Sequence, residues 1–378
     1  MVAQVTFMKF QRILIMMEII QSPKFEIEEI SNFKTKPKDS ELRFGQLFTD
    51  RMFLREYKDG SWQTGKIKAY ENFSLPPSTI VFHYGQEIFE GMKAFSQTGT
   101  NRAVIFRPEE NAKRFNSSAE RMCMPTLEDG YFLESIRHLI ELEKKWIPKL
   151  RGTALYIRPT MIATEHALGV HPSSEYYYFT ILSPSGPYFA EGFKPTKIKV
   201  EDQYVRAAKG GTGYVKAGGN YASSLYAAQI AKKEGYSQVL WLDAHERKYV
   251  EEVGAMNIAF VMDETIYTPP LKGTILPGIT RKSVIQLADD LGIPLKEKAL
   301  EITTIVEAIK SGNLTEIFGI GTAASIAPVG VLKYKENVMK INDGEIGPIT
   351  QSLYDELTGI QYGEIEDRHG WIFPIMKD

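Results

Sequence analysis

A single lysine, Lys216, stands in a glycine-rich segment that could form a Schiff base with an aldehyde cofactor. Residues 210–221 read GGTGYVKAGGNY. Glycine has no side chain and lets the backbone bend closely around a ligand. A lysine held in such a bend can be partly desolvated, which lowers its pKa and makes its amine nucleophilic. Taken alone, the segment also fits a flexible surface loop with an ordinary solvated lysine.

Two nucleotide-binding glycine motifs do not fit this segment. A dinucleotide fingerprint (G-x-G-x-x-G) that starts at Gly211 and Gly213 needs a third glycine where the chain has Lys216. A P-loop (G-x-x-x-x-G-K-[ST]) that uses Gly213 and Gly218 needs a lysine where the chain has Gly219. Both motifs therefore fail at the residue that would do the chemistry.

Three further segments carry residue types suited to a ligand site. In residues 276–283 (LPGITRKS) a Pro-Gly turn precedes a helix-like stretch, whose free N–H groups near Ile279 and Thr280 would bind a phosphate. In residues 318–324 (FGIGTAA) small side chains let backbone N–H groups face a ligand. Residues 251–257 (EEVGAMN) open with carboxylates, and a buried carboxylate needs a partner such as a protonated ring nitrogen. Each segment alone also fits a plain helix start, a close-packed turn or a solvent-facing strand end.

Taken together, these and other motifs resemble the branched-chain amino-acid aminotransferases, which are pyridoxal-phosphate enzymes of fold type IV. The resemblance runs from about residue 82 to residue 373. Many separate motifs in one order are far more specific than any single motif. The matching strings are His83-Tyr84, Phe89-Glu90-Gly91-Met92-Lys93-Ala94-Phe95, Phe106-Arg107-Pro108 with Asn111 and Arg114, Leu155-Tyr156-Ile157-Arg158-Pro159, Gly186-Pro187-Tyr188-Phe189, Lys216-Ala217-Gly218-Gly219-Asn220-Tyr221, Glu252-Val253-Gly254, Leu276-Pro277-Gly278 and Gly321-Thr322-Ala323.

The resemblance implies a set of residues that hold pyridoxal 5′-phosphate. Lys216 would carry the cofactor covalently, and its freed amine would then move the α-proton of the substrate. Glu252 would keep the pyridine nitrogen protonated, and Tyr221 would hydrogen-bond the 3′-oxygen of the ring. The residues that would bind the phosphate are Arg114, a bidentate donor, with Ile279, Thr280 and Thr322.

The resemblance also implies where the substrate binds. Phe89, Tyr156 and Tyr188 would form the apolar wall around the substrate side chain, although each alone is more often a core residue. The backbone around Thr322 and Ala323 would face the substrate carboxylate. These residues would therefore set the orientation of the amino acid.

The resemblance also implies residues that would recognise glutamate and residues that would join two subunits. Arg158 and Tyr84 would help to bind the side-chain carboxylate of glutamate, and Arg158 lies in a strand-like run where a charge needs a partner. In the family, Tyr84 and the loop that contains Leu168 and Val170 complete the pocket of the neighbouring subunit. The resemblance therefore implies a homodimer.

The expected activity is the exchange of an amino group between L-leucine, L-isoleucine or L-valine and 2-oxoglutarate by a ping-pong mechanism. One methylene is worth only about 1–3 kcal/mol of discrimination, so the three amino acids should not be separated strongly. Two alternatives of the same fold type are a D-amino-acid transaminase and an aminodeoxychorismate lyase, whose chains are usually shorter. A binding protein that keeps the fold without catalysis is an alternative of another class. Intact Lys216, Glu252 and Arg114 argue against it.

The composition is ordinary for a soluble globular protein. The chain has 378 residues, 43% of them hydrophobic and 24% charged, with a net charge of −2. This balance gives no electrostatic reason to expect a nucleic acid or an anionic membrane as partner, and no apolar run approaches transmembrane length. The six histidines show no metal-ligand spacing, so no metal is expected. The expected small-molecule partners are amino acids and 2-oxo acids.

Alternating helix-like and strand-like segments predict a mixed α/β fold with two domains and a ligand site in the cleft between them. The resemblance implies that these are the two domains of a fold type IV enzyme, with the active site in that cleft. Three prolines and two glycines in residues 183–196 mark the boundary. We expect an N-terminal α/β domain over 1–187, a linker over 188–197 and a C-terminal cofactor-binding domain over 198–378. Apolar residues at helical spacing predict helices that start near residue 129, near residue 225 and just after residue 278. Strands are expected at 103–106, 155–157, 176–182, 197–200, 239–242 and 256–261.

The single cysteine and the N-terminal residues indicate the cellular compartment in which we expect the protein. One cysteine, Cys123, excludes an intramolecular disulfide, and its apolar neighbours predict that it is buried. The reducing cytoplasm is the simplest location. Residues 1–20 contain a short apolar run that Glu18 interrupts, without a cleavage site for a signal peptide. We expect either a disordered extension there or a true start at Met17.

Overall fold

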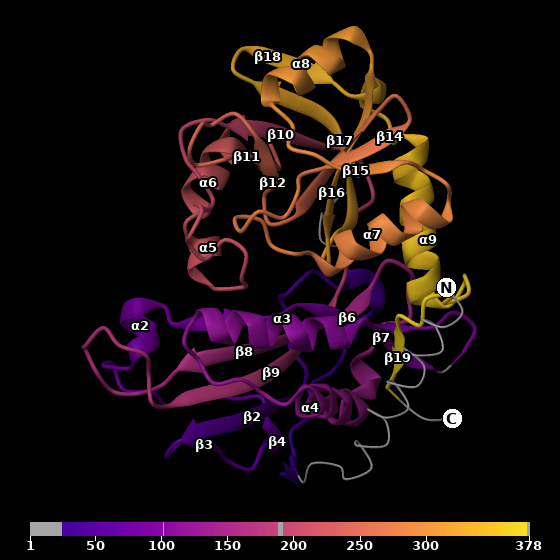
Figure 1. The fold of residues 1–378 in the computed structure, drawn as a ribbon. Helices are drawn as coiled ribbons and strands as arrows, with labels where there is room; N and C mark the ends of the chain where they lie inside the picture. The colour runs from indigo at the N-terminus through magenta and orange to yellow at the C-terminus, as the bar shows by residue number, and fades with distance from the viewer. Residues whose placement is uncertain (1–24, 101, 188–191, 376–378) are drawn as a thin grey trace, which may run out of the picture. The chain divides into compact units, whose positions relative to one another are not determined.

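Two mixed β-sheets, each with its own helices, form the two units of the chain (Figure 1). The computed structural model describes residues 25–100, 102–187 and 192–375. The first unit comprises Met1–Tyr188 together with Ile360–Asp378, and the second comprises Phe189–Gly359. The expected mixed α/β fold class is confirmed.

The first unit is built on a ten-stranded sheet whose main path runs β1-β4-β2-β9-β8-β6-β7-β19. Most neighbours are antiparallel, and β3 and β5 pair beside this path with β2 and β8. The strands are β1 (Glu26–Ile27), β2 (Arg51–Lys58), β3 (Ser61–Trp62), β4 (Lys66–Ala69), β5 (Glu87–Phe89), β6 (Met92–Ser96), β7 (Ala103–Phe106), β8 (Ala154–Ala163), β9 (Tyr176–Ser185) and β19 (Ile372–Pro374).

Helices cover one face of this sheet because their apolar stripes match the apolar face of its strands. Phe115 of α3 (Pro108–Arg121) and Ile136 of α4 (Asp129–Leu142) pack in one core with Ile157 of β8. Pro108 occupies the first turn of α3, where a missing N–H costs nothing. In β8 the side chains alternate, so Ile157 faces the helices while Arg158 faces the opposite side. The shorter helices of this unit are η1 (Asp39–Glu41), α2 (Ile80–Tyr84) and η2 (Lys144–Trp146).

The second unit is built on a nine-stranded sheet whose main path runs β12-β11-β10-β17-β16-β13-β14-β15, with β18 beside β17. Here β10 pairs in parallel with β11 and β17, whereas β16 pairs antiparallel with β13 and β17. The strands are β10 (Thr196–Glu201), β11 (Gln238–Leu242), β12 (Val250–Val253), β13 (Asn257–Met262), β14 (Thr265–Thr268), β15 (Leu295–Glu297), β16 (Leu314–Gly321), β17 (Ser325–Tyr334) and β18 (Asn337–Lys340).

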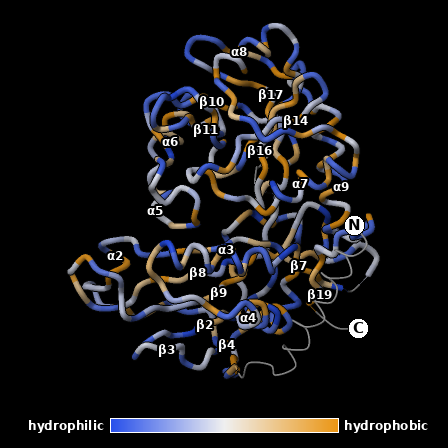
Figure 2. Tube along the Cα trace, in the orientation of Figure 1, coloured by the Kyte–Doolittle hydropathy of each residue, from blue (hydrophilic) through white to orange (hydrophobic). Residues whose placement is uncertain are grey.

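The core of the second unit lies along these strands. Figure 2 shows the apolar colour following the strands of each sheet, while the polar colour gathers in the connecting loops. Ile305 of α8 packs with Phe260 of β13 and Leu240 of β11. The helices are α5 (Gly219–Ala222), α6 (Leu225–Lys233), α7 (Ile279–Asp290), α8 (Ile302–Ser311), η3 (Asn342–Gly344) and α9 (Pro348–Tyr362), of which the residues from Ile360 on belong to the first unit.

The C-terminal segment differs from the expected domain boundary. Residues 360–378 belong to the first unit, because β19 pairs antiparallel with β7 through Phe373 and Ile105. A domain that runs without a break from 198 to 378 is therefore wrong. Residues 188–191 of the expected linker and residues 1–20 of the expected extension lie outside the described residues.

None of the helices in the described part of the chain has the length and apolar character needed to cross a membrane.

Candidate active site

Asn220 fixes the glycine-rich loop that carries Lys216. Its side-chain oxygen accepts a hydrogen bond from the Thr212 hydroxyl at 2.8 Å. Its amide nitrogen donates to the carbonyls of Thr212 and Val215 at 2.8 and 2.9 Å. Because Asn220 belongs to α5, these three bonds tie the loop to the helix that follows it. The segment is therefore a structured turn rather than a free surface loop.

Gly213 explains why the loop needs glycine at one position. A Cβ atom there would lie 2.3 Å from the Cβ of Ala207 and 2.5 Å from the Thr274 carbonyl oxygen. Real Cβ contacts of this length do not occur. The glycine thus allows two backbone segments to approach beside Lys216.

Lys216 and Tyr221 form a polar pair in this loop. The Lys216 amine donates to the Tyr221 hydroxyl at 2.9 Å, and both side chains are half-buried. An amine and a phenol at this separation can hold and exchange a proton. The structure thus brings together two of the residues that the sequence predicted for the cofactor.

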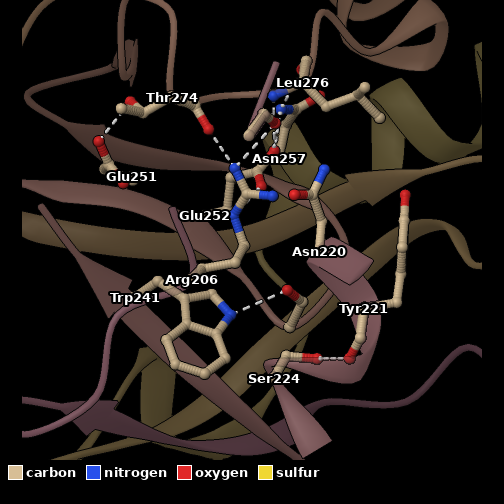
Figure 3. Close-up of polar contacts among 12 residues, drawn as sticks. Arg206, Asn220, Tyr221, Ser224, Trp241, Glu251, Glu252, Asn257, Thr274 and Leu276 are labelled. Carbon is tan, nitrogen blue, oxygen red and sulfur yellow. Dashed lines mark hydrogen bonds and ion pairs between the residues drawn. The ribbon is translucent and has the colours of Figure 1, made fainter. Parts of the chain in front are cut away.

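Glu252 lies at the centre of a buried polar cluster in the second unit (Figure 3). Its side chain is on β12, and Asn257 donates to its Oε1 at 3.0 Å, as does the backbone N–H of Leu276 at 3.3 Å. The Nε of Arg206 lies 2.6 Å from Oε2 in an ion pair, although that N–H does not meet hydrogen-bond geometry. Burial raises the pKa of Glu252 to about 7, and the positive charge of Arg206 opposes that rise.

Arg206 is a site residue that the sequence reasoning missed. Besides its ion pair with Glu252, its guanidinium donates to the backbone carbonyls of Gly213 and Thr274. It therefore links the Lys216 loop to the carboxylate. A lone arginine ten residues before Lys216 carries no pattern of its own, so only its buried surroundings identify it.

The segment around Leu276-Pro277-Gly278 packs directly against this cluster. Asn257 also donates to the Leu276 carbonyl at 3.0 Å, and a Cβ on Gly278 would lie 2.0 Å from the Asn257 side-chain oxygen. Helix α7 begins at Ile279 immediately after this glycine. The first N–H groups of a helix have no partner within it, and they form an anion site. Ile279 and Thr280 thus begin this helix, as the sequence predicted, and phosphate binding there stays a prediction.

The segment around Thr322 forms the turn between β16 and β17. A Cβ on Gly319 or Gly321 would lie less than 3 Å from the Met256 side chain, so close packing accounts for these two glycines. Thr322 and Ala323 are half-buried in the turn that follows. Their proposed contacts with ligands remain predictions.

One pocket of the second unit gathers three of the predicted motifs. Its lining includes residues from the glycine-rich loop, from the Glu252 segment and from the Leu276 segment, which are far apart in the sequence. The lining residues are Arg206, Gly213, Val215, Asn220, Tyr221, Ser224, Glu252, Gly254, Ala255 and Leu276.

The donor set of this unit fits pyridoxal 5′-phosphate. A primary amine (Lys216) lies beside a phenol (Tyr221), as an aldehyde with a neighbouring ring oxygen requires. A buried carboxylate with a raised pKa, Glu252, would be stabilised by a protonated ring nitrogen. The start of α7 offers N–H groups to a phosphate. Among the described residues, no group of three or more His, Cys, Asp or Glu side chains could hold a metal ion.

In the first unit, Arg114 is held by a buried carboxylate. Glu90 accepts from the Arg114 Nε at 2.7 Å and from its terminal nitrogen at 2.8 Å, and it also accepts from Asn111 at 2.7 Å. Glu90 is fully buried and Arg114 nearly so. Both belong to the strings on which the resemblance rests, but the sequence reasoning gave Glu90 no role. The structure identifies it as the residue that orients Arg114.

Phe89, Tyr156 and Arg158 share one face of the first sheet. The Arg158 guanidinium lies 4.6 Å from the centre of the Phe89 ring and donates to the Tyr156 hydroxyl at 3.1 Å. A Cβ on Gly91 would lie 2.1 Å from that hydroxyl, so the glycine makes room for Tyr156. On the neighbouring strand β6, burial lowers the pKa of Lys93 to about 8.

Tyr84 and the loop after β8 also lie together. The Tyr84 hydroxyl donates to the Leu168 carbonyl. Tyr84, Leu168 and Val170 are 42%, 65% and 85% exposed. Tyr188, the remaining predicted substrate residue, lies outside the described residues.

Cys123 is exposed, so the prediction that it is buried is wrong. It follows α3 in a turn with a positive φ of 55°, and Tyr176 binds its backbone carbonyl rather than its thiol. The buried side chains in this region belong to neighbours such as Met124. Apolar neighbours therefore did not predict the direction of this side chain.

Comparisons with known sequences point to one family. Residues 87–331 match the family described as amino-transferase class IV. A protein of Staphylococcus epidermidis (strain ATCC 12228 / FDA PCI 1200), named probable branched-chain-amino-acid aminotransferase, is 49% identical over 358 residues, which cover 94% of this chain and 99% of that protein. Branched-chain-amino-acid aminotransferase 2 of Bacillus subtilis (strain 168) is 48% identical over 346 residues, which cover 91% and 95%.

Solved structures agree with the sequence comparisons. The branched-chain amino acid aminotransferase of Escherichia coli superposes with a TM-score of 0.73 at 28% identity, covering 86% of this chain and 99% of that chain. The branched-chain aminotransferase of the thermophilic archaeon Thermoproteus uzoniensis, solved with norvaline, gives a TM-score of 0.70 at 26% identity, covering 86% and 99%. Both similarities extend over the two units.

Proposed function

We infer, from the fact that this chain belongs to the class IV aminotransferases, that it is a branched-chain amino-acid aminotransferase. It exchanges the amino group between L-leucine, L-isoleucine or L-valine and 2-oxoglutarate. Identities of 48–49% over more than nine tenths of the chain with proteins of that name support the substrate class. The observation that carries the chemistry is the buried Glu252 in a pocket that Tyr221, the partner of Lys216, also lines.

The proposed cofactor is pyridoxal 5′-phosphate. When bound, it supplies an electron sink for the bond that breaks at the α-carbon of the amino acid. In the second unit Lys216 and Tyr221 would hold its aldehyde end and Glu252 its ring nitrogen. The residues that would bind its phosphate are Arg114, Ile279, Thr280 and Thr322. A structurally similar branched-chain amino acid aminotransferase, with a TM-score of 0.71 at 26% identity, was solved with pyridoxamine 5′-phosphate, which supports this choice.

Proton transfer at the α-carbon is assigned to Lys216. Its amine is the general base that removes the α-proton and later returns a proton on the other side of the exchange. Tyr221, 2.9 Å away, accepts a hydrogen bond from that amine and orients it. Glu252 would keep a proton on the ring nitrogen because its carboxylate is buried and needs a positive partner in addition to Arg206 and Lys216.

Substrate recognition is assigned to the first unit and to the turn at Thr322. Phe89, Tyr156 and Tyr188 form the apolar wall for the branched side chain. Arg158 binds the distal carboxylate of 2-oxoglutarate, for which a planar guanidinium is suited. The backbone at Thr322 and Ala323 binds the α-carboxylate.

Assembly as a homodimer belongs to the same proposal. Exposed Tyr84, Leu168 and Val170 form an apolar group that a second copy would cover and that would complete the partner's pocket. Light scattering during gel filtration should give twice the mass of the chain. We place the enzyme in the cytoplasm, where its single cysteine needs no oxidising environment.

The visible absorption spectrum of the purified protein tests the activity. Protein loaded with pyridoxal 5′-phosphate should show a band near that of a protonated Schiff base, and L-leucine should convert it to the spectrum of the amine form. D-alanine and aminodeoxychorismate serve as competing substrates. A response to either of them but not to L-leucine would favour another enzyme of this fold type, and a protein that takes up no cofactor would indicate a binding protein without catalysis.

Reduction with borohydride followed by peptide mapping tests the assignment of Lys216. Lys93 is the informative alternative, because burial lowers its pKa to about 8 and makes it a competent amine. We expect the label on Lys216, and we expect Lys216→Ala to bind the cofactor without a covalent bond and to lose turnover. A label on Lys93 would overturn the assignment.

A further inference from the structure

Thr274 connects Glu251 to Arg206 in the second unit (Figure 3). Its hydroxyl donates to Oε1 of Glu251 at 2.5 Å, and its backbone carbonyl accepts a hydrogen bond from the Arg206 guanidinium. The same guanidinium forms the ion pair with Glu252, whose shortest separation is 2.6 Å. These contacts form a chain that runs from Glu251 to Glu252.

The Thr274 carbonyl is held in place by a side-chain bond. Thr274 lies in the irregular segment between β14, which ends at Thr268, and α7, which begins at Ile279. Its backbone is therefore part of neither a helix nor a strand. Glu251 lies on β12, which pairs antiparallel with β11. The hydrogen bond from the Thr274 hydroxyl thus fixes a loop carbonyl to a sheet.

Glu251 is a buried hydrogen-bond acceptor. It is 7% exposed, and Thr274 is 8% exposed. Oε2 of Glu251 is buried and has no hydrogen-bond partner among the described residues. Burial raises the pKa of Glu251, whereas the Thr274 hydrogen bond and the positive charge of Arg206 oppose that rise. Burial of a half-partnered carboxyl group favours its neutral form, so Glu251 offers Thr274 an acceptor rather than a charge.

The position of Arg206 matters because Glu252 and the ring nitrogen of the cofactor would share one proton. Burial raises the pKa of Glu252 to about 7, and the positive charge of Arg206 is the largest effect that opposes this rise. The other charged groups that act on it are Lys216, which lowers the pKa, and Glu251, which raises it when ionised. If Arg206 moved away, Glu252 would hold the shared proton more tightly, and the ring nitrogen would lose it.

We propose that Glu251 and Thr274 are positioning residues that hold Arg206 against Glu252 and thereby keep the shared proton on the ring nitrogen. The proposal deepens the proposed function and rests on it, because it requires a cofactor ring beside Glu252. Both residues act through Arg206 and not on the cofactor itself. A protonated ring nitrogen is what makes the ring an effective electron sink, so these two residues support the chemistry from outside the pocket.

Nuclear magnetic resonance of the ring nitrogen tests the proposal without turnover. The protein is loaded with pyridoxal 5′-phosphate that carries an isotopic label at this nitrogen, and the chemical shift reports whether the nitrogen is protonated. The double variant Glu251→Leu/Thr274→Val removes the bond and leaves neither partner with an unsatisfied polar group. We expect it to move the proton about tenfold toward Glu252, as partial loss of one charge interaction predicts. Thr274→Val alone should move the signal the same way, so the test does not depend on how well the double variant folds.

Two conservative variants separate the hydrogen bond from the charge. Glu251→Gln keeps an acceptor for the Thr274 hydroxyl and has no charge, and Thr274→Ser keeps the hydroxyl. Both should show the wild-type nitrogen signal. Thr350→Val is the matched control, because the Thr350 hydroxyl donates at 2.6 Å to buried Glu316, which is not among the proposed site residues. It should lower the melting temperature and leave the nitrogen signal unchanged.

The outcomes distinguish the positioning role from the proposed function. If the variants without the bond take up the cofactor and keep the wild-type nitrogen signal, the positioning role is wrong while the proposed function stands. If Glu251→Gln moves the signal as far as the double variant does, the charge of Glu251 acts rather than its hydrogen bond, and the proposal is wrong. If wild-type protein takes up no pyridoxal 5′-phosphate, the proposed function fails, and the positioning role fails with it.

Discussion

Glu252 shows how much of the chemistry depends on the surroundings of a single side chain. Most glutamates face water, but this one is 3% exposed, with Arg206 and Asn257 as its side-chain partners. Burial, not charge, dominates its pKa. A buried carboxyl group of this kind is suited to bind the cofactor's ring nitrogen, which must stay protonated.

Replacing Glu252 with glutamine should change how stability depends on pH. A carboxyl pKa raised from 4.5 to about 7 on folding means that the folded state holds the proton more tightly. The resulting stabilisation is present below pH 4.5 and is lost as the pH rises through about 7. The difference between a pKa of 4.5 and one of about 7 corresponds to about 3 kcal/mol.

Urea unfolding of cofactor-free protein provides the measurement for Glu252. Between pH 4.5 and pH 7.5 the wild type should lose about 3 kcal/mol of unfolding free energy relative to Glu252→Gln, which has no proton to lose. A difference between the two proteins that stays constant over this range would show that the carboxyl group is not desolvated in the apoprotein.

Cys123 gives a prediction that follows from its exposure. Because the thiol faces solvent, Ellman's reagent should titrate one thiol per chain in native protein, without denaturant. Cys123→Ser should give none. Mild peroxide should leave transamination unchanged, because the thiol belongs to none of the proposed binding groups. A native protein that reacts only after unfolding would contradict the exposed position, and loss of activity that dithiothreitol restores would contradict its independence from the site.

At the scale of elements, local patterns predicted some strands with the observed bounds. For other strands they predicted only part of the observed length. The expected strand at 103–106 coincides with β7. The expected strand at 155–157 covers only part of β8, which continues through Pro159 to Ala163. Proline usually ends a central strand because it lacks an N–H. Here its carbonyl still accepts from the backbone N–H of Glu90 at 2.8 Å, and the strand goes on.

The loop before α5 yields a prediction about packing. Gly213→Ala would force a Cβ against Ala207 and the Thr274 carbonyl, and overpacking of this kind costs about 1–3 kcal/mol. We expect a lower melting temperature and weaker binding of pyridoxal 5′-phosphate. Gly219→Ala is the matched control, because a Cβ there meets nothing within 4 Å and alanine favours the helix. Equal effects of the two changes would mean that the close approach at Gly213 is not what the loop requires.

At the scale of the whole molecule, one chain must accept two different substrates at one set of residues. Leucine must give up its amino group and leave as a 2-oxo acid before 2-oxoglutarate can bind. Initial rates at several fixed concentrations of 2-oxoglutarate should therefore give parallel double-reciprocal lines. Intersecting lines would indicate that both substrates bind together, which a transaminase of this kind does not allow.

The order of segments along the chain does not show that the C-terminal segment belongs to the first unit. Residues 360–378 follow the second unit in sequence but belong to the first, because β19 adds to the edge of the first sheet. The proline- and glycine-rich stretch near residue 190 predicts one crossing between units. A three-residue strand without a strong pattern gives no hint that the chain returns.

The sequence by itself determined the class of fold and the chemistry of the predicted residues. Lysine, tyrosine, glutamate and the glycines around them are recognisable because their types and order limit the reactions that they can support. Helical and strand periodicities are local properties, so α4, α6 and α7 could be placed from short windows of sequence.

Only the tertiary structure decided which of these residues meet and what state they are in. The ion pair of Arg206 with Glu252, the close approach of Gly278 to Asn257 and the exposure of Cys123 all depend on segments far apart in the chain. Burial sets the pKa of Glu252, and burial is a property of the packed chain rather than of a neighbouring residue.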